Sequence, residues 1–211
     1  PYIFGRLDLS KLLKFIPLRT FSRERDAYFL NVQSIAVDGV KLPINSSLFS
    51  IKKNRTGRST SYVGGTRFTS GNRYTLLAPP IYDTLSAQFR RACAARGIRP
   101  VAAVSPFQHC FDAASAKTSK LGFDVPSIDF TFKKKVTWRI AGANSVVKVN
   151  DRVFCLAFQK TDEVYEYRSM LIGTFQQQNG FFQFDLVGSR LGFIPTLLAL
   201  DTTCSAFKFV Y

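Results

Sequence analysis

The sequence has little of what most enzymes use for catalysis or for holding a metal. Its 211 residues include a single histidine, His109, together with one methionine and one tryptophan. The four cysteines lie far apart, and no C-x-x-C pair occurs. A structural zinc site needs four ligands, which usually come in closely spaced pairs. We therefore expect no metal, and no motif indicates a cofactor.

Long hydrophobic runs and a leader segment are also missing. No apolar run reaches the roughly 18 residues that a transmembrane helix requires, so we expect no membrane span. The chain begins at Pro1, without an initiator methionine or a charged segment followed by an apolar one. We expect a mature or proteolytically processed chain, which is compatible with secretion.

Acidic residues are scarce. The chain has 14 of them against 29 lysines and arginines, which gives a net charge of +15. Such a charge attracts anionic partners, whether nucleic acid, acidic polysaccharide or an acidic protein surface. No zinc-finger, RNP or P-loop motif supports a nucleic-acid partner. The densest basic runs, 52–55 and 133–135, lie among turn formers or at strand ends, where solvated charge is the simpler interpretation.

Strand-like patterns dominate what is present. Phenylalanine occurs 21 times, and apolar and β-branched residues recur in short runs. Residues 28–37 and 40–44 predict a β-hairpin around the turn Asp38-Gly39. Residues 1–25 and 52–62 look like loops, and 64–69 like a strand entering a turn. Further strands are predicted at 128–132, 136–140, 146–149, 153–158, 170–174, 181–185 and 190–193.

One helix stands out among the strands. A Pro-Pro pair at 79–80 suits a first helical turn. Apolar residues then recur every four positions, and Gly97 provides a left-handed stop. The members of this apolar stripe are Ile81, Leu85, Phe89 and Cys93. The fold class is therefore mainly β, largely antiparallel, with one principal helix.

The cysteines and two glycosylation sequons favour an oxidising, secretory environment. An even number of widely spaced cysteines suits disulfides. Asn45 and Asn54 each begin an Asn-x-Ser/Thr sequon, so both are candidate glycosylation sites. Cys93 lies on the apolar stripe of the helix, and we expect a buried free thiol there.

Several segments together resemble the nepenthesin-like plant aspartic proteases. Residues 64–82 resemble the family's second active-site segment, in which two apolar residues lead into Asp-Ser/Thr-Gly and a Pro-Pro pair precedes a helix. Residues 171–179, LIGTFQQQN, are close to the family's I-L/I-G-x-F-Q-Q-Q-N. Further matches, in the family's order, are VSPFQHCFD at 104–112, VPSI at 125–128, FCLAF at 154–158, FDL at 184–186 and RLGF at 190–193.

The resemblance implies the C-terminal lobe of a pepsin-like bilobal fold at 26–211, with 1–25 as the inter-lobe linker region. It is closest to the inactive branch of that family, the xylanase inhibitors and basic 7S globulins, some of which are cut into two chains. We therefore expect a separate N-terminal lobe as a permanent partner. The resemblance also implies a disulfide between Cys110 and Cys155, with Cys204 tied to the partner chain.

The same resemblance places Thr69, followed by Ser70 and Gly71, where active members carry the catalytic aspartate. Proteolysis needs two carboxylates that share one proton, and a threonine hydroxyl does not titrate near neutral pH. A shifted alignment would leave an active protease, but the matching prolines and Tyr82 disfavour it. A nucleophilic pair of Cys110 and His109 is conceivable, but the resemblance places Cys110 in a disulfide. Paired carboxylates for glycoside hydrolysis find no motif.

The resemblance suggests two functions. One is inhibition of a microbial cell-wall-degrading glycoside hydrolase, a xylanase or endoglucanase, by a basic side chain inserted between its catalytic carboxylates. The other is a seed protein of the basic 7S globulin type, with a storage or ligand-binding role. Secretion to the apoplast or storage in a seed vacuole would follow. Candidate target-binding residues, in the loops 97–101 and 159–169, are Arg99, Arg168, Tyr165 and Tyr167.

Overall fold

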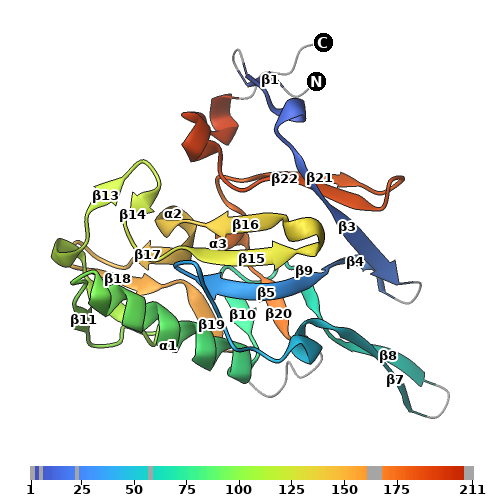
Figure 1. Ribbon diagram of the computed structural model, residues 1–211, viewed down its shortest axis with the longest axis horizontal. Helices are drawn as coiled ribbons and strands as arrows, with labels where there is room; N and C mark the ends of the chain where they lie inside the picture. The colour runs from blue at the N-terminus through green and yellow to red at the C-terminus, as the bar shows by residue number, and fades with distance from the viewer. Residues whose placement is uncertain (1–2, 5–6, 22–23, 57–58, 161–167, 207–211) are drawn as a thin grey trace.

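The computed structural model describes residues 3–4, 7–21, 24–56, 59–160 and 168–206, and β-strands are its main regular structure (Figure 1). The strands are β1 (Ile3–Phe4), β2 (Leu7–Asp8), β3 (Lys14–Phe21), β4 (Glu24–Leu30), β5 (Val32–Val37), β6 (Val40–Lys41), β7 (Ile51–Thr56), β8 (Ser59–Gly64), β9 (Thr66–Phe68), β10 (Thr75–Leu77), β11 (Pro100–Val101), β12 (Cys110–Asp112), β13 (Thr118–Ser119), β14 (Gly122–Phe123), β15 (Ile128–Phe132), β16 (Thr137–Ile140), β17 (Val146–Lys148), β18 (Val153–Leu156), β19 (Phe158–Lys160), β20 (Met170–Ile172), β21 (Phe181–Asp185) and β22 (Arg190–Ile194).

The main helix is α1 (Pro79–Ala95), and two single-turn helices are α2 (Gly142–Ser145) and α3 (Thr174–Gln177). Short 3-10 turns cover Leu9–Lys11, Ser46–Phe49, Ala113–Ser115, Lys133–Lys135, Leu197–Leu200 and Cys204–Ala206. Among the described residues, no helix is long and apolar enough to cross a membrane.

The largest sheet has eight strands in the order β19-β10-β20-β9-β4-β3-β22-β21. Most neighbours are antiparallel, but β9 pairs with β20 and β10 with β19 in parallel. These parallel contacts bring segments about a hundred residues apart to the same edge of the sheet. They set the turn after β9 beside the turn after β20. Two four-stranded sheets, β16-β15-β5-β6 and β11-β12-β18-β17, complete the main architecture.

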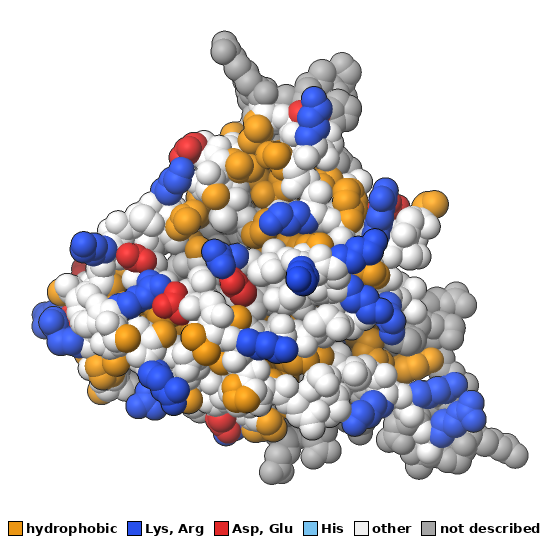
Figure 2. Space-filling view, viewed as in Figure 1, with side chains coloured by type: hydrophobic (Ala, Val, Ile, Leu, Met, Phe, Trp, Pro, Cys, Tyr) orange, Lys and Arg blue, Asp and Glu red, His pale blue; other side chains and the backbone are white. Residues whose placement is uncertain are grey.

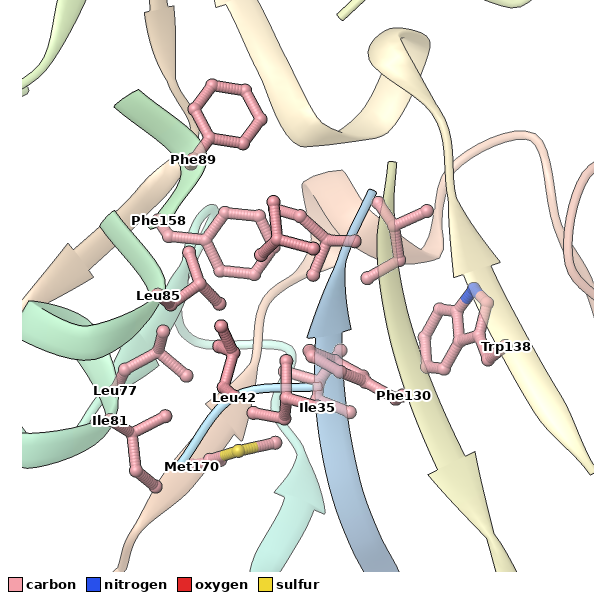
Figure 3. Close-up of a cluster of buried hydrophobic side chains, with 14 of the residues drawn as sticks. Ile35, Leu42, Leu77, Ile81, Leu85, Phe89, Phe130, Trp138, Phe158 and Met170 are labelled. Carbon is pink, nitrogen blue, oxygen red and sulfur yellow. The ribbon is translucent and has the colours of Figure 1, made fainter. Parts of the chain in front are cut away.

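The predicted helix and hairpin are confirmed. All four residues of the apolar stripe on α1 are fully buried. In Figure 3, Ile81, Leu85 and Phe89 face a core that includes Phe158, with strand residues beyond it. Gly97 has φ +74°, and the helix ends there. The turn between β5 and β6 has both central residues at positive φ, Asp38 at 52° and Gly39 at 80°, as a two-residue hairpin requires.

Two segments predicted as loops are strands. The segment 14–21 forms β3, which pairs with β4 and β22 in the middle of the main sheet. Its partner β22 lies more than 170 residues away, so no local pattern indicated it. Most of 52–62 belongs to the β7–β8 hairpin, which runs in continuous register from Ile51 opposite Gly64 to Thr56 opposite Ser59. The sequence of that hairpin is mostly polar and basic, so it gave no apolar alternation from which a strand could be predicted. The linker role of 1–25 stays a prediction.

Candidate functional site

The candidate site is the turn that follows β9, which begins at Thr69. The Thr69 N–H donates to the Ile172 carbonyl at 3.0 Å, which fixes this turn against the end of β20. The Gln177 side-chain amide donates to the carbonyls of Thr69 and Ile172, at 3.3 and 3.0 Å. Two chain segments far apart in the sequence therefore define the position of Thr69.

The Thr69 hydroxyl closes this turn on itself. It accepts a hydrogen bond from the Gly71 N–H at 3.2 Å and lies 3.3 Å from the Asn72 side-chain oxygen, to which it donates. Residues 64–82 contain no aspartate or glutamate. The next acid along the chain, Asp83, lies on α1 and forms an ion pair with Lys160 at 3.0 Å. The turn thus offers hydroxyl and amide groups but no carboxylate.

A buried glutamine, Gln176, links the start of β10 to Asn144 of α2 and to Ala157. The Gln176 side chain is 1% exposed, and its amide uses its full hydrogen-bonding capacity. The oxygen accepts from the N–H and hydroxyl of Thr75, at 2.9 and 2.8 Å. The nitrogen donates to the carbonyls of Asn144 and Ala157, at 3.1 and 2.7 Å.

The Thr75 hydroxyl in turn accepts from the Gly173 N–H at 3.1 Å. Gln176 was not among the functional residues predicted from the sequence. The run of three glutamines in an apolar context was the available signal.

The four cysteines fall into three environments. Cys110 and Cys155 face each other across β12 and β18 and form the disulfide that the resemblance implied. Cys93 is buried and free, as expected, and burial raises the pKa of its thiol to about 12. Cys204 is exposed and forms no disulfide within the described residues. Its link to a partner chain stays a prediction.

In the part of the chain that the structure describes, the candidate target-binding residues Arg99 and Arg168 have separate surroundings. Arg99 lies just before β11 with 66% of its side chain exposed, and its guanidinium donates to Asp112. That hydrogen bond holds the pKa of Asp112 below its usual range. Arg168 is half-buried, donates to the carbonyl of Tyr62, and lies 5.2 Å from the centre of the Phe29 ring. Residues 165 and 167, both tyrosines, lie outside the described residues.

The remaining candidate positions differ in exposure. Asn45 is exposed and caps a 3-10 turn by accepting from the Ser47 N–H at 3.0 Å. Asn54 belongs to β7, and its side chain lies outside the description. His109 is partly buried and stacks on Tyr82, with ring centres 5.9 Å apart. Burial, and then the charge of Arg90, lower the pKa of His109, so its imidazole is neutral at pH 7.

Comparisons with known proteins agree with this architecture. A probable aspartic proteinase, GIP2 of Nicotiana benthamiana, is 38% identical over 98% of this chain and 46% of its own length. Gamma conglutin 1 of Prunus dulcis is 37% identical over 96% of this chain and 43% of its own length. The chain therefore spans less than half the length of these relatives.

Solved structures show the same fold. The crystal structure of edgp superposes with a TM-score of 0.85 and 36% identity, over 95% of this chain and 49% of that one. Basic 7S globulin from soybean superposes with a TM-score of 0.68 over 93% of this chain and 47% of that one; at 22% identity it shows the fold alone. These proteins share the pepsin-like C-terminal lobe. A family model described as "Xylanase inhibitor C-terminal" matches residues 27–195, and the chain belongs to that family.

Proposed function

We propose that the protein is a catalytically inactive relative of aspartic proteases that inhibits microbial cell-wall-degrading glycoside hydrolases, either xylanases or endoglucanases. The observation that carries the inactive part is the turn at Thr69. Aspartic proteolysis requires a carboxylate from each lobe, so that one acts as a base while the other holds a proton. The Thr69 hydroxyl is committed to Gly71 and Asn72 and cannot share that proton. One vacant position is enough to stop the mechanism.

The inhibitory part rests on charge and on the exposure of Arg99. The chain carries a net charge of +15, and Figure 2 shows lysines and arginines spread over the viewed face with few acidic side chains among them. Such a surface steers the protein toward an acidic catalytic cleft. Arg99 projects from the segment 97–101 and already binds a carboxylate, that of Asp112. Inhibition would exchange this internal carboxylate for those of the target enzyme.

We assign Arg168 a supporting role in the same surface. Its guanidinium is anchored by the Tyr62 carbonyl and the Phe29 ring, so it fixes the end of the segment 159–169. Tyr165 and Tyr167 would then contact the target from that segment.

The proposal includes a second lobe and an extracellular or vacuolar location. The chain covers 46% of its relative GIP2, so we expect an N-terminal lobe, joined as a separate chain through Cys204. Glycans on Asn45 and Asn54, and secretion to the apoplast or a seed storage vacuole, complete this expectation.

A seed storage or ligand-binding role is the second candidate. The observation that favours it is the relationship to gamma conglutin 1 of Prunus dulcis. This role makes no use of Arg99 and predicts no effect on glycoside hydrolases.

Titration of purified glycoside hydrolases with the intact protein distinguishes the inhibitor role from the storage or ligand-binding role. The panel should include fungal xylanases and endoglucanases that cleave xyloglucan or cellulose. The inhibitor proposal predicts saturating inhibition near one to one, weakened at least roughly tenfold by Arg99→Ala because a charge-assisted contact is lost. Arg190→Ala is the matched control, since Arg190 is also exposed and paired with a single aspartate, Asp185. No inhibition by excess protein would reject the proposal and favour the storage role.

A further inference from the structure

A hollow between α1 and β11 has features of a binding site that the proposed inhibition does not use. Figure 1 shows the end of α1 lying beside β11. Two adjoining cavities occupy this position, with volumes of about 250 and 350 Å³. Both are lined by Arg90, Pro100 and Phe111, so together they form one concave surface. A ligand the size of a small aromatic acid fits such a volume.

The two cavities differ in chemistry. The first has a polar lining, to which Arg90, Gln108 and His109 contribute. The second is lined mainly by carbon, from Ala87, Ala94 and Ile98 together with the shared Pro100 and Phe111, and Arg91 lines it as well. A surface with guanidinium groups beside apolar side chains matches a ligand that has an anionic group and an apolar body.

The charge of Arg90 and Arg91 has no acidic partner in the part of the chain that the structure describes. Arg90 and Arg91 are exposed, and within the described residues neither forms an ion pair with an aspartate or glutamate. The one acid on α1, Asp83, lies about two turns before Arg90 and is already paired with Lys160 at 3.0 Å. A guanidinium binds a planar carboxylate through two parallel hydrogen bonds.

We propose that this hollow binds a small organic carboxylate with an aromatic or aliphatic body. Arg90 binds the carboxylate, with Arg91 adding charge. The body of the ligand lies against Ile98, Pro100 and Phe111. The site shares the segment 97–101 with Arg99 but is lined by other side chains. It does not require inhibition of a glycoside hydrolase and remains if that function is rejected.

The pKa of His109 should change when a carboxylate binds in the hollow. On α1, Tyr82 stacks on the His109 ring. The charge of Arg90 lowers the pKa of His109, whereas the charge of Asp83 raises it. Asp83 is also paired with Lys160 of β19. Burial and Arg90 keep the pKa of free His109 below its ordinary value. A bound carboxylate favours the charged imidazole and raises that pKa. Binding therefore takes up a proton, and the affinity should increase as the pH falls.

The experiment uses 4-coumarate as the probe and its methyl ester as a neutral control of the same body. The dissociation constant of each is measured by calorimetry on the intact protein at about pH 7.5 and about pH 5.5, on either side of the ordinary histidine pKa. The imidazole signal of His109 is followed by NMR and assigned by its loss in His109→Gln. We expect the carboxylate to bind more tightly at the lower pH, the ester to bind at least roughly tenfold more weakly, and the His109 titration to move upward.

Two variants test whether 4-coumarate binds in this hollow. Arg90→Gln should weaken 4-coumarate at least roughly tenfold, whereas Arg190→Gln, the same change on β22, should leave it unaltered. Unchanged folding of both variants is checked by their urea midpoints. The proposal is overturned if the probe does not bind, if the ester binds equally well, if Arg90→Gln has no effect, or if the His109 signal does not respond to saturating probe.

Discussion

Gln176 joins separate segments of the lobe, and its replacement tests how much this buried amide contributes to stability. The side chain is 1% exposed and makes four hydrogen bonds. Gln176→Leu keeps a similar volume but removes all four. The N–H of Thr75 and the carbonyls of Asn144 and Ala157 then lose a partner in a buried environment.

Each buried group left unsatisfied costs about 1–3 kcal/mol. The losses share one site and are not additive, because the surroundings relax together. We therefore expect Gln176→Leu to lower the free energy of unfolding by about 3–6 kcal/mol, a large part of the total for a domain of this kind. Gln177 provides the comparison, since it is only partly buried and its amide donates to the carbonyls of Thr69, Ile172 and Gly173.

Gln176→Glu sharpens the test through its pH dependence. An ionised carboxylate has no donor for the carbonyls of Asn144 and Ala157, so the neutral acid is favoured and its folded pKa is raised above its unfolded value. Below the unfolded pKa, near 4.3, the acid is neutral in both states. As the pH rises above that value, the folded state loses up to about 1.4 kcal/mol per pH unit relative to the native sequence.

Urea unfolding of the native protein and both variants, at about pH 4 and about pH 7, measures these differences. The deficit of Gln176→Glu should be larger at the higher pH by at least about 1.4 kcal/mol. A Gln176→Leu deficit below about 1 kcal/mol, or a Gln176→Glu deficit equal at the two pH values, would refute the proposed role of the amide.

Three further outcomes follow from the described contacts. Replacing Cys110 and Cys155 together by alanine should lower the free energy of unfolding by about 4 kcal/mol, because the disulfide closes a loop of 45 residues; a loss below about 1 kcal/mol in urea unfolding would contradict this. Cys93 should resist iodoacetamide in the folded protein at about pH 8, since burial raises its pKa to about 12; rapid labelling, detected by mass spectrometry, would argue against a buried thiol. Arg96→Ala should cost less than about 1 kcal/mol, because its ion pair with Asp38 is partly exposed, and the loss should shrink in salt; a salt-independent loss would show another origin.

The parts of the fold that depend on local sequence were predictable. The α1 stripe has a helical period, and the helix places all four members in the core. The turn Asp38-Gly39 has residues that tolerate positive φ, and the hairpin forms there.

The missed elements depend on distant partners. β3 has Pro17 in its middle and no clear alternation, yet it pairs with β22 from the other end of the chain. The β7–β8 hairpin is polar and basic, and its continuous ladder needs no apolar face. Composition alone cannot distinguish such strands from surface loops, since both are rich in polar and basic residues.

The candidate site was predictable only through resemblance. Thr69 is an ordinary residue by composition, and the match of the segment 64–82 to a protease motif made it a candidate. The supporting Gln176 was missed because its partners are 19 to 101 residues away. A buried amide of this kind becomes recognisable only when the fold brings its donors and acceptors together.

The proposed loss of the catalytic carboxylate at Thr69 is tested most directly by acid proteolysis with the intact protein. An unfolded protein substrate is incubated with it between about pH 3 and about pH 5, where paired carboxylates share a proton. We predict no cleavage above the buffer blank. Cleavage that is abolished by a transition-state inhibitor of aspartic proteases would contradict the account and return the protein to the active enzymes.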